Sequence, residues 1–229
     1  MSKEASKSIQ GFTHIRYFQD SYESEEMLEK STDYLKLMNK RRSVRDFSEK
    51  EIPLEVIENI IKTASTAPSG AHKQPWTFCV VKDAEIKRNI RMAAEAEEER
   101  SYNERMSDSW LKDLKPLGTN AKKPFLEMAP YLIIVFKKPY DLDENCEKHQ
   151  NYYVNESVGL ACGMLISAIH NAGLVTLTHT PSPMRFLEEI LDRPSNERAY
   201  LLLPVGYAAD VTYVPNIKRK PLESVMKLY

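Results

Sequence analysis

Four short apolar segments recur along the chain, and helical patterns separate them. They are TFCVVK at 77–82, PYLIIVFK at 130–137, LVTLTHTP at 174–181 and AYLLLPV at 199–205. Strands that alternate with helices predict a central sheet covered by helices. The helix expected at 152–172 is apolar on more than one face, which indicates deep burial or a subunit interface.

Length and charge limit the class of protein. A chain of 229 residues with 42% hydrophobic and 28% charged residues can form a single α+β domain with a sizeable core. The net charge of −1 gives no basic surplus, so we expect no nucleic-acid partner. Residues 1–23 show no clear period and are expected to form an extended N-terminal arm, which leaves 24–229 as the domain.

The cysteines and the apolar stretches bear on the compartment. The three cysteines lack the spacing of metal ligands, so we expect reduced thiols and no metal site. The apolar stretches are too short to cross a bilayer, and the first 20 residues have no signal-peptide core. The chain is therefore expected to be soluble and intracellular, and membrane-anchored only if an anchor precedes Met1.

The densest polar cluster is Arg41-Arg42-Ser43-Val44-Arg45. Guanidinium groups can bind phosphate oxygens in bidentate geometry, and a serine adds a donor. Taken alone, such a run is more often a solvated basic turn. No GxGxxG or GxxxxGK[ST] pattern is present, so a classical dinucleotide fold or a P-loop is not indicated.

Two further segments support a flat, phosphorylated ligand. The loop TAPSGAHKQPW at 66–76 contains small residues that let the backbone approach a planar ring. KRKPL at 218–222 offers a second anion site, although by itself it is typical of a solvated tail.

Five segments in this order resemble the FMN-binding framework of the nitroreductase superfamily, and most closely that of iodotyrosine deiodinases. They are RRSVRDF, TAPSGAHKQPW, NAGLVTLTHTP, LLPVGY and KRKPL, and the resemblance covers about residues 25–229. It implies an α+β nitroreductase-like fold with a central mixed β-sheet flanked by helices. It also implies a homodimer with exchanged terminal segments and FMN at the interface.

The resemblance assigns flavin-binding roles by position. Arg41, Arg42, Ser43 and Arg219 would hold the phosphate and ribityl region, Val44 belongs to the same segment, and Arg45 would lie near the pyrimidine edge. Pro68, Ser69 and Gly70 would line the ring. Thr178 and His179 flank Thr180, whose hydroxyl would donate to flavin N5 as the catalytic group. His179 stands where vertebrate relatives are expected to have threonine.

A second set of residues would select the substrate. Glu98 and Tyr102 are spaced i, i+4 on one helix face, and Lys123 follows a loop with proline and glycine. Alone, Glu98 belongs to an acidic run that is commonly solvated. In iodotyrosine deiodinases such a trio binds the amino-acid zwitterion from a lid, here about residues 95–123. The family also uses a backbone contact from the residue matching Ala71.

The resulting hypothesis is reductive dehalogenation of 3-iodotyrosine and 3,5-diiodotyrosine to tyrosine and iodide. FMN would supply the electrons, with NADPH, directly or through a reductase, as the ultimate donor. The lid segment 107–119 is polar and is expected to be a mobile loop. Two alternatives stay open: a general FMN nitroreductase or quinone reductase, and a non-catalytic protein that binds flavin or halotyrosine.

Overall fold

The computed structural model describes residues 6–229, and the chain divides into two compact units, Met1–Lys40 and Arg41–Tyr229. Residues 1–5 of the expected arm lie outside the described residues. The expected border between arm and domain after residue 23 stays a prediction.

The first unit contains a hairpin and one helix. Strands β1 (Ser6–Ile9) and β2 (Phe12–Ile15) pair antiparallel, and the turn between them has positive φ at Gln10 and Gly11. Helix α1 (Ser24–Asn39) follows, and none of its residues is buried. Four of its hydrophobic residues, Met27, Leu28, Tyr34 and Leu35, are more than half exposed.

The second unit is built on a four-stranded sheet with the order β3-β4-β8-β7. The strands are β3 (Trp76–Val81), β4 (Tyr131–Lys137), β7 (Val175–Thr176) and β8 (Arg198–Gly206), and neighbouring strands pair antiparallel. A parallel bridge between Ser43 and Thr176 gives the sheet its mixed character. The predicted α+β fold with a central sheet is confirmed.

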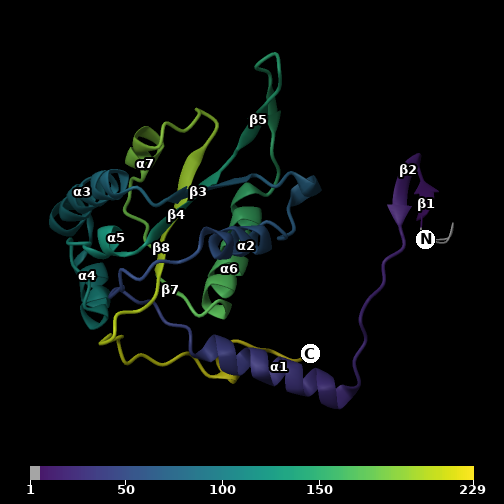
Figure 1. The fold of residues 1–229 in the computed structure, drawn as a ribbon, viewed down its shortest axis with the longest axis horizontal. Coiled ribbons are helices and arrows are strands. Elements are labelled where there is room, and N and C mark those ends of the chain that lie inside the picture. The colour runs from purple at the N-terminus through teal and green to yellow at the C-terminus, as the bar shows by residue number, and fades with distance from the viewer. Residues whose placement is uncertain (1–5) are drawn as a thin grey trace. The chain divides into compact units, whose positions relative to one another are not determined.

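Helices cover both faces of this sheet (Figure 1). Helices α2 (Leu54–Ala64) and α6 (Val154–Asn171) lie on one face. Helices α3 (Ala84–Arg100), α5 (Phe125–Met128) and α7 (Arg185–Ile190) lie on the other.

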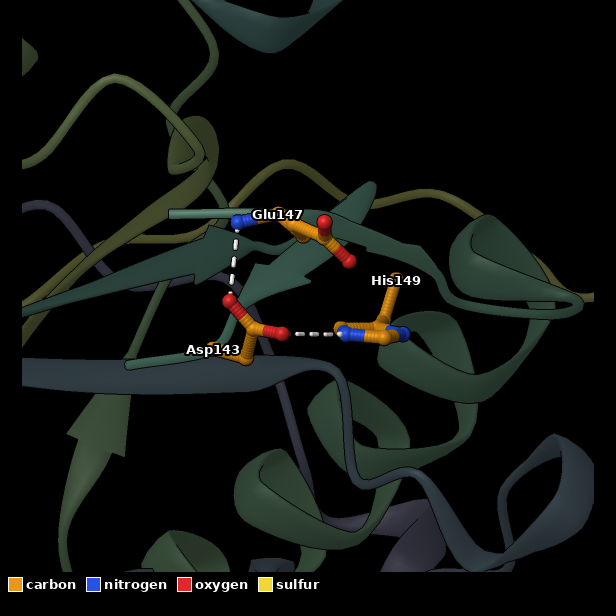
Figure 2. A group of neighbouring side chains, drawn as sticks. All are labelled: Asp143, Glu147 and His149. Atoms are coloured by element: carbon orange, nitrogen blue, oxygen red, sulfur yellow. Dashed lines mark hydrogen bonds and ion pairs between the residues drawn. The ribbon is translucent and has the colours of Figure 1, made fainter. Parts of the chain in front are cut away.

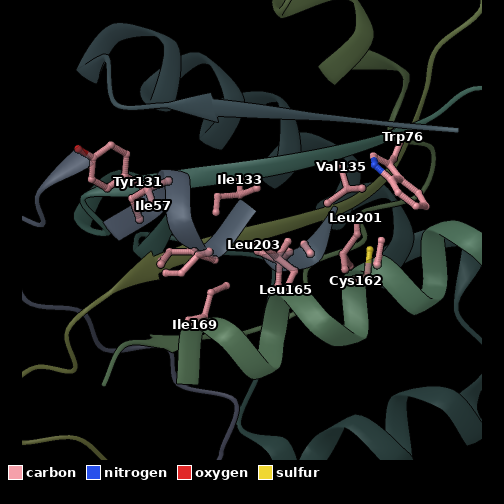
Figure 3. Packing of buried hydrophobic residues seen from close by; sticks show 14 of the residues in the cluster. Ile57, Trp76, Tyr131, Ile133, Val135, Cys162, Leu165, Ile169, Leu201 and Leu203 are labelled. Atoms are coloured by element: carbon pink, nitrogen blue, oxygen red, sulfur yellow. The ribbon is translucent and has the colours of Figure 1, made fainter. Parts of the chain in front are cut away.

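Strand β4 supplies both hydrophobic cores, because successive side chains of a strand point to opposite faces. Ile133 and Val135 pack toward α6, where Leu165 and Ile169 are fully buried (Figure 3). Ile134 and its neighbours at i±2 pack toward α3 and α5. The apolar run at 130–137 is therefore a strand buried on both faces.

Two cysteines pack among hydrophobic side chains. Cys162 of α6 lies in the first core, and burial raises the pKa of its thiol to about 12. Burial also raises the pKa of the Cys79 thiol on β3, while nearby Arg193 acts in the opposite direction. Both thiols stay protonated at neutral pH and act as small hydrophobic groups.

The expectation of a loop at 107–119 is wrong for the described structure, and the mobility of the segment stays a prediction. Helix α4 (Asp108–Leu114) and the 3₁₀ turn η4 (Lys115–Leu117) occupy the segment, and Gly118 ends it with φ 61°. The Ser107 hydroxyl caps α4 by accepting from the Trp110 N–H at 3.3 Å. The spacing of Trp110, Leu114 and Leu117 at i, i+4, i+7 places these apolar side chains on one face, a pattern hidden among polar residues.

The remaining elements are short. Strands β5 (Tyr140–Leu142) and β6 (Lys148–Gln150) form a hairpin. The other turns are η2 (Gly70–His72), η3 (Ser101–Arg105) and η5 (Leu222–Ser224). Within residues 6–229, none of the helices is both long enough and apolar enough to cross a bilayer.

Gly206, at the end of β8, permits a close approach that tests this packing. A Cβ there would lie 2.7 Å from Pro130 Cδ and 3.0 Å from Phe47 Cδ1. We expect Gly206→Ala to lower the free energy of unfolding by about 1–3 kcal/mol, because the core must shift. Gly159→Ala is the control, since its Cβ would make an ordinary contact, 3.4 Å from the Tyr200 hydroxyl. Urea unfolding measures both, and equal stability of the two variants would contradict the packing described.

Candidate functional site

A cavity of about 190 Å³ lies where the end of α3, the lid helix α4 and the segment after β7 meet. Seven residues that the sequence analysis selected line it: Arg45, Glu98, Tyr102, Lys123, Thr178, His179 and Thr180. The structure therefore brings the proposed substrate trio and the proposed flavin N5 segment to one site.

The centre of the trio is an ion pair removed from solvent. Lys123 Nζ lies 3.3 Å from Glu98 Oε2, and the two side chains are 4% and 12% exposed. Lys123 also donates to the Thr119 hydroxyl at 3.3 Å and to the Asn120 carbonyl. Burial lowers the pKa of Lys123 and nearby Arg45 adds to that effect, whereas Glu98 opposes it. Glu98 is thus the counter-ion of a buried ammonium.

The other acids of the run have different partners. Glu95 accepts from the Lys123 backbone N–H at 2.6 Å and pairs with Arg91 at 3.0 Å. Burial opposes ionisation of Glu95, but these two donors outweigh it, and its pKa lies below the usual value. Glu97 and Glu99 pair with arginines and with Lys122, respectively. Among these four acids, only Glu98 lines the cavity.

Tyr102 reaches the cavity from a π-helical turn. In η3 the Met106 N–H donates to the Ser101 carbonyl at 2.9 Å, a bond that spans five residues. Lys123 Nζ lies 5.9 Å from the centre of the Tyr102 ring. Single π turns of this kind are common at functional sites.

The arginine segment meets the C-terminal tail. Arg219 donates to the Arg41 carbonyl at 3.1 Å, and Arg42 donates to the Pro215 carbonyl. Val44 is buried, and its N–H donates to the Thr176 carbonyl at 3.2 Å. Hydrogen bonds therefore join the segment that contains Arg41, Arg42 and the exposed Ser43 to the tail that contains Arg219, and these residue types are donors that can bind a phosphate.

The loop at Pro68–Ala71 does not line this cavity. The Gly70 N–H donates to the Ser157 hydroxyl at 3.3 Å, and a Cβ on Gly70 would lie 2.8 Å from the Tyr152 carbonyl oxygen. Ala71 has φ 49°, uncommon for a residue with a side chain. Such conformations cost free energy and cluster at functional sites.

His179 lies deep in the wall of the cavity. Its backbone pairs with Leu202 of β8, and its ring makes an edge contact with Phe125 at 5.8 Å. Its Nε2 is buried and has no hydrogen-bond partner among the described residues. Burial lowers the pKa of His179 to about 3, and the charges of Lys123 and Arg45 contribute. The ring is neutral at physiological pH.

Sequence reasoning missed the apolar part of the wall. Met106, Trp110, Leu114, Leu117 and Phe125 line the cavity together with Ser182. The helical spacing of Trp110, Leu114 and Leu117 was the sequence signal that could have predicted this apolar wall. Trp110, Thr180 and Ser182 also border a larger cavity of about 1070 Å³ on the side of α7.

One group of possible metal ligands lies elsewhere. Asp143, Glu147 and His149 converge on the β5–β6 hairpin, with their ligand atoms within 4.8 Å of one another (Figure 2). Asp143 accepts from the His149 ring at 3.1 Å and from the Glu147 N–H at 2.8 Å. These bonds lower the pKa of Asp143. The group is explained as a network within the hairpin, and we assign no metal to it.

His179 predicts a specific dependence of stability on pH. Its ring stays neutral in the folded protein, whereas in the unfolded chain it gains a proton below its ordinary pKa of about 6.5. The stability is therefore complete above about pH 6.5 and is lost as the pH falls toward 3, by up to about 1.4 kcal/mol per pH unit.

We expect His179→Thr to remove this contribution from the slope of unfolding free energy between pH 7 and 4. The exposed His14→Gln variant is the control and should keep the wild-type slope. Urea unfolding of the flavin-free protein measures all three. An unchanged slope in His179→Thr would mean that another group governs acid stability.

Comparison with known proteins agrees with this geometry. Residues 38–207 match the model of the nitroreductase family. An iodotyrosine deiodinase of Haliscomenobacter hydrossis is 61% identical over 215 residues, which cover 94% of this chain and 97% of that protein. Human iodotyrosine deiodinase 1 is 46% identical over 226 residues, covering 97% of this chain and 78% of that protein.

A solved structure shows the same architecture. The crystal structure of oxidized iodotyrosine deiodinase bound to FMN and 3-iodo-L-tyrosine superposes with a TM-score of 0.71 and 33% identity, covering 82% of this chain and 96% of that one. The family match spans most of the chain, and the identities extend over nearly its whole length. The chain therefore belongs to the nitroreductase family and, within it, to the iodotyrosine deiodinases.

Proposed function

We propose that this protein is an FMN-dependent oxidoreductase that removes iodide from 3-iodotyrosine and 3,5-diiodotyrosine and leaves tyrosine. Each carbon–iodine bond that is replaced by carbon–hydrogen consumes two electrons and one proton and releases one iodide. Reduced FMN supplies the electrons. The observation that carries the proposal is the buried Glu98–Lys123 pair, which lines the same cavity as Arg45 and Thr180.

The ion pair explains why an amino acid would be selected. A zwitterion that enters between the two side chains places its ammonium against Glu98 and its carboxylate against Lys123. One buried pair then becomes two, so no charge is left without a partner. Tyr102 can donate its hydroxyl to the substrate carboxylate. A ligand that lacks either charge would leave one protein charge desolvated and unpaired, which is costly.

The remaining residues fit the flavin. Arg41, Arg42, Ser43 and Arg219 would bind its phosphate and ribityl group. Arg45 would face the pyrimidine edge, where a fixed cation stabilises the negative charge that reduction creates. Thr180 would donate to N5, and NADPH or a reductase would restore the electrons.

A homodimer with exchanged terminal segments would complete the site. Pro68, Ser69, Gly70 and Ala71 do not line the cavity of their own chain, although the family places them at the flavin and substrate. The Ala71 N–H has no hydrogen-bond partner among the described residues, so it can donate to a substrate phenolate. The uncovered apolar residues of α1 and of the C-terminal tail offer surface for a second copy.

Anaerobic turnover tests the proposed function. We expect the FMN-loaded, chemically reduced protein to release iodide and reoxidise when 3-iodotyrosine is added. Rapid oxidation of NADPH by nitroaromatics without iodide release would favour a general nitroreductase. Stoichiometric binding without reoxidation would favour a binding protein. Either outcome contradicts the proposal.

The Glu98→Gln variant tests whether Glu98 binds the substrate. Loss of one charge of a buried pair costs roughly 2 kcal/mol or more, which is about a 30-fold increase in the Kd for 3-iodotyrosine. Glu99→Gln is the matched control, because Glu99 pairs with exposed Lys122 at 3.0 Å and does not line the cavity. We expect its Kd to change by less than about twofold. Fluorescence titration measures both, and equal effects would remove Glu98 from the site.

Complementation tests the dimer. If the cavity and the loop at 68–71 come from different copies, mixed dimers of Glu98→Gln and Gly70→Ala contain one intact site. Random mixing should then restore about a quarter of wild-type activity. The double variant Glu98→Gln/Gly70→Ala is the control and should recover nothing. Failure of the mixture to exceed its separate components would contradict a shared site.

A further inference from the structure

Arg105 joins two segments of the site that lie far apart in the sequence. It is the last residue of η3, the turn that carries Tyr102. Its Nη1 donates to the Ser182 carbonyl at 2.9 Å and lies 2.9 Å from Glu97 Oε2. One guanidinium therefore contacts the base of the lid and the loop after Thr180.

That loop has little other support. His179 is fixed to β8 by two backbone hydrogen bonds with Leu202, of 2.9 and 3.1 Å, and the next backbone bond is from Leu187 to Met184. Residues 180–183 lie between these two points. In the described structure they take part in one hydrogen bond, which is the bond from Arg105 to the Ser182 carbonyl. Thr180 and Ser182 both line the cavity.

We infer that Arg105 is a positioning residue that couples the turn at 101–105, which carries Tyr102, to the loop at 180–183. When the guanidinium holds both segments, Tyr102 and Thr180 keep one relative placement. Ordering of one segment by a ligand then favours the ordered state of the other, because both share a partner. The identity of the ligand at Tyr102 rests on the proposed function. The coupling between the two segments is a property of the protein without ligand.

Arg100 supplies a matched control. It pairs with Oε1 of the same Glu97 at 2.8 Å, carries the same charge and precedes Arg105 by five residues in the chain. No hydrogen bond joins it to Ser182 in the described structure. Arg100→Ala therefore removes a cation from the same carboxylate and leaves the bridge intact.

The test uses the FMN-loaded protein of 229 residues and two readouts. We expect Arg105→Ala to raise the Kd for 3-iodotyrosine about 5- to 20-fold, within the usual size of coupling between sites, and Arg100→Ala to change it less than about twofold. Without substrate, hydrogen exchange should rise at both 101–106 and 179–187 in Arg105→Ala, and at neither in Arg100→Ala, because the hydrogen-bonded amides of His179 and Leu187 flank the loop. Arg105→Lys should recover most of both effects, since an ammonium can contact both acceptors.

Two outcomes would overturn the inference. One is wild-type exchange at 179–187 in Arg105→Ala, and the other is equal effects of the Arg100 and Arg105 variants. The exchange readout needs no substrate, so it stands even if the wild type fails to bind 3-iodotyrosine. That last result would contradict the proposed function instead.

Discussion

The buried pair between Glu98 and Lys123 is the interaction on which the site depends. Two opposite charges removed from water are tolerated when each neutralises the other and further hydrogen bonds satisfy them. The surroundings supply these bonds, since Thr119 and Asn120 accept from the ammonium. Glu95 accepts from the Lys123 backbone N–H and so fixes where the side chain begins. The pair is therefore preorganised for the exchange of partners with a zwitterion that we propose.

The sheet places this pair beside Arg45 and Thr180, two of the residues that we propose bind the flavin. The strands β4 and β8 are buried on both faces, and they fix α3 and α5 on one side. These two helices bracket the lid, so Glu98 and Lys123 are anchored although the residues between them are mostly exposed. On the sheet itself, the bridges of Thr176 to Ser43 and of His179 to Leu202 hold the arginine segment and the Thr180 segment close together. The cavity thus lies between a rigid sheet edge and an added helical lid.

Much of this could be predicted from the sequence because the signals are local. Continuous apolar runs gave β3, β4 and β8, and the resemblance selected seven residues that line one cavity. The helix at Asp108–Leu114 was missed because three apolar residues among charges are a weak periodic signal until the cavity gives them a surface to cover. The hydrogen bond of Arg105 to Ser182 joins residues 77 positions apart, and no local pattern could reveal it. The position of Pro68–Ala71 outside the cavity likewise depends on the tertiary fold, so no local pattern could predict it.

A crystal structure of the FMN-loaded protein with 3-iodotyrosine is the decisive measurement. We expect the substrate ammonium within hydrogen-bond distance of Glu98, and its carboxylate at Lys123 and Tyr102. We also expect the iodophenol ring stacked on the flavin, with Thr180 at N5 and Ala71 of a second copy at the phenolate. A substrate bound elsewhere, with the Glu98–Lys123 pair still closed, would contradict the central claim.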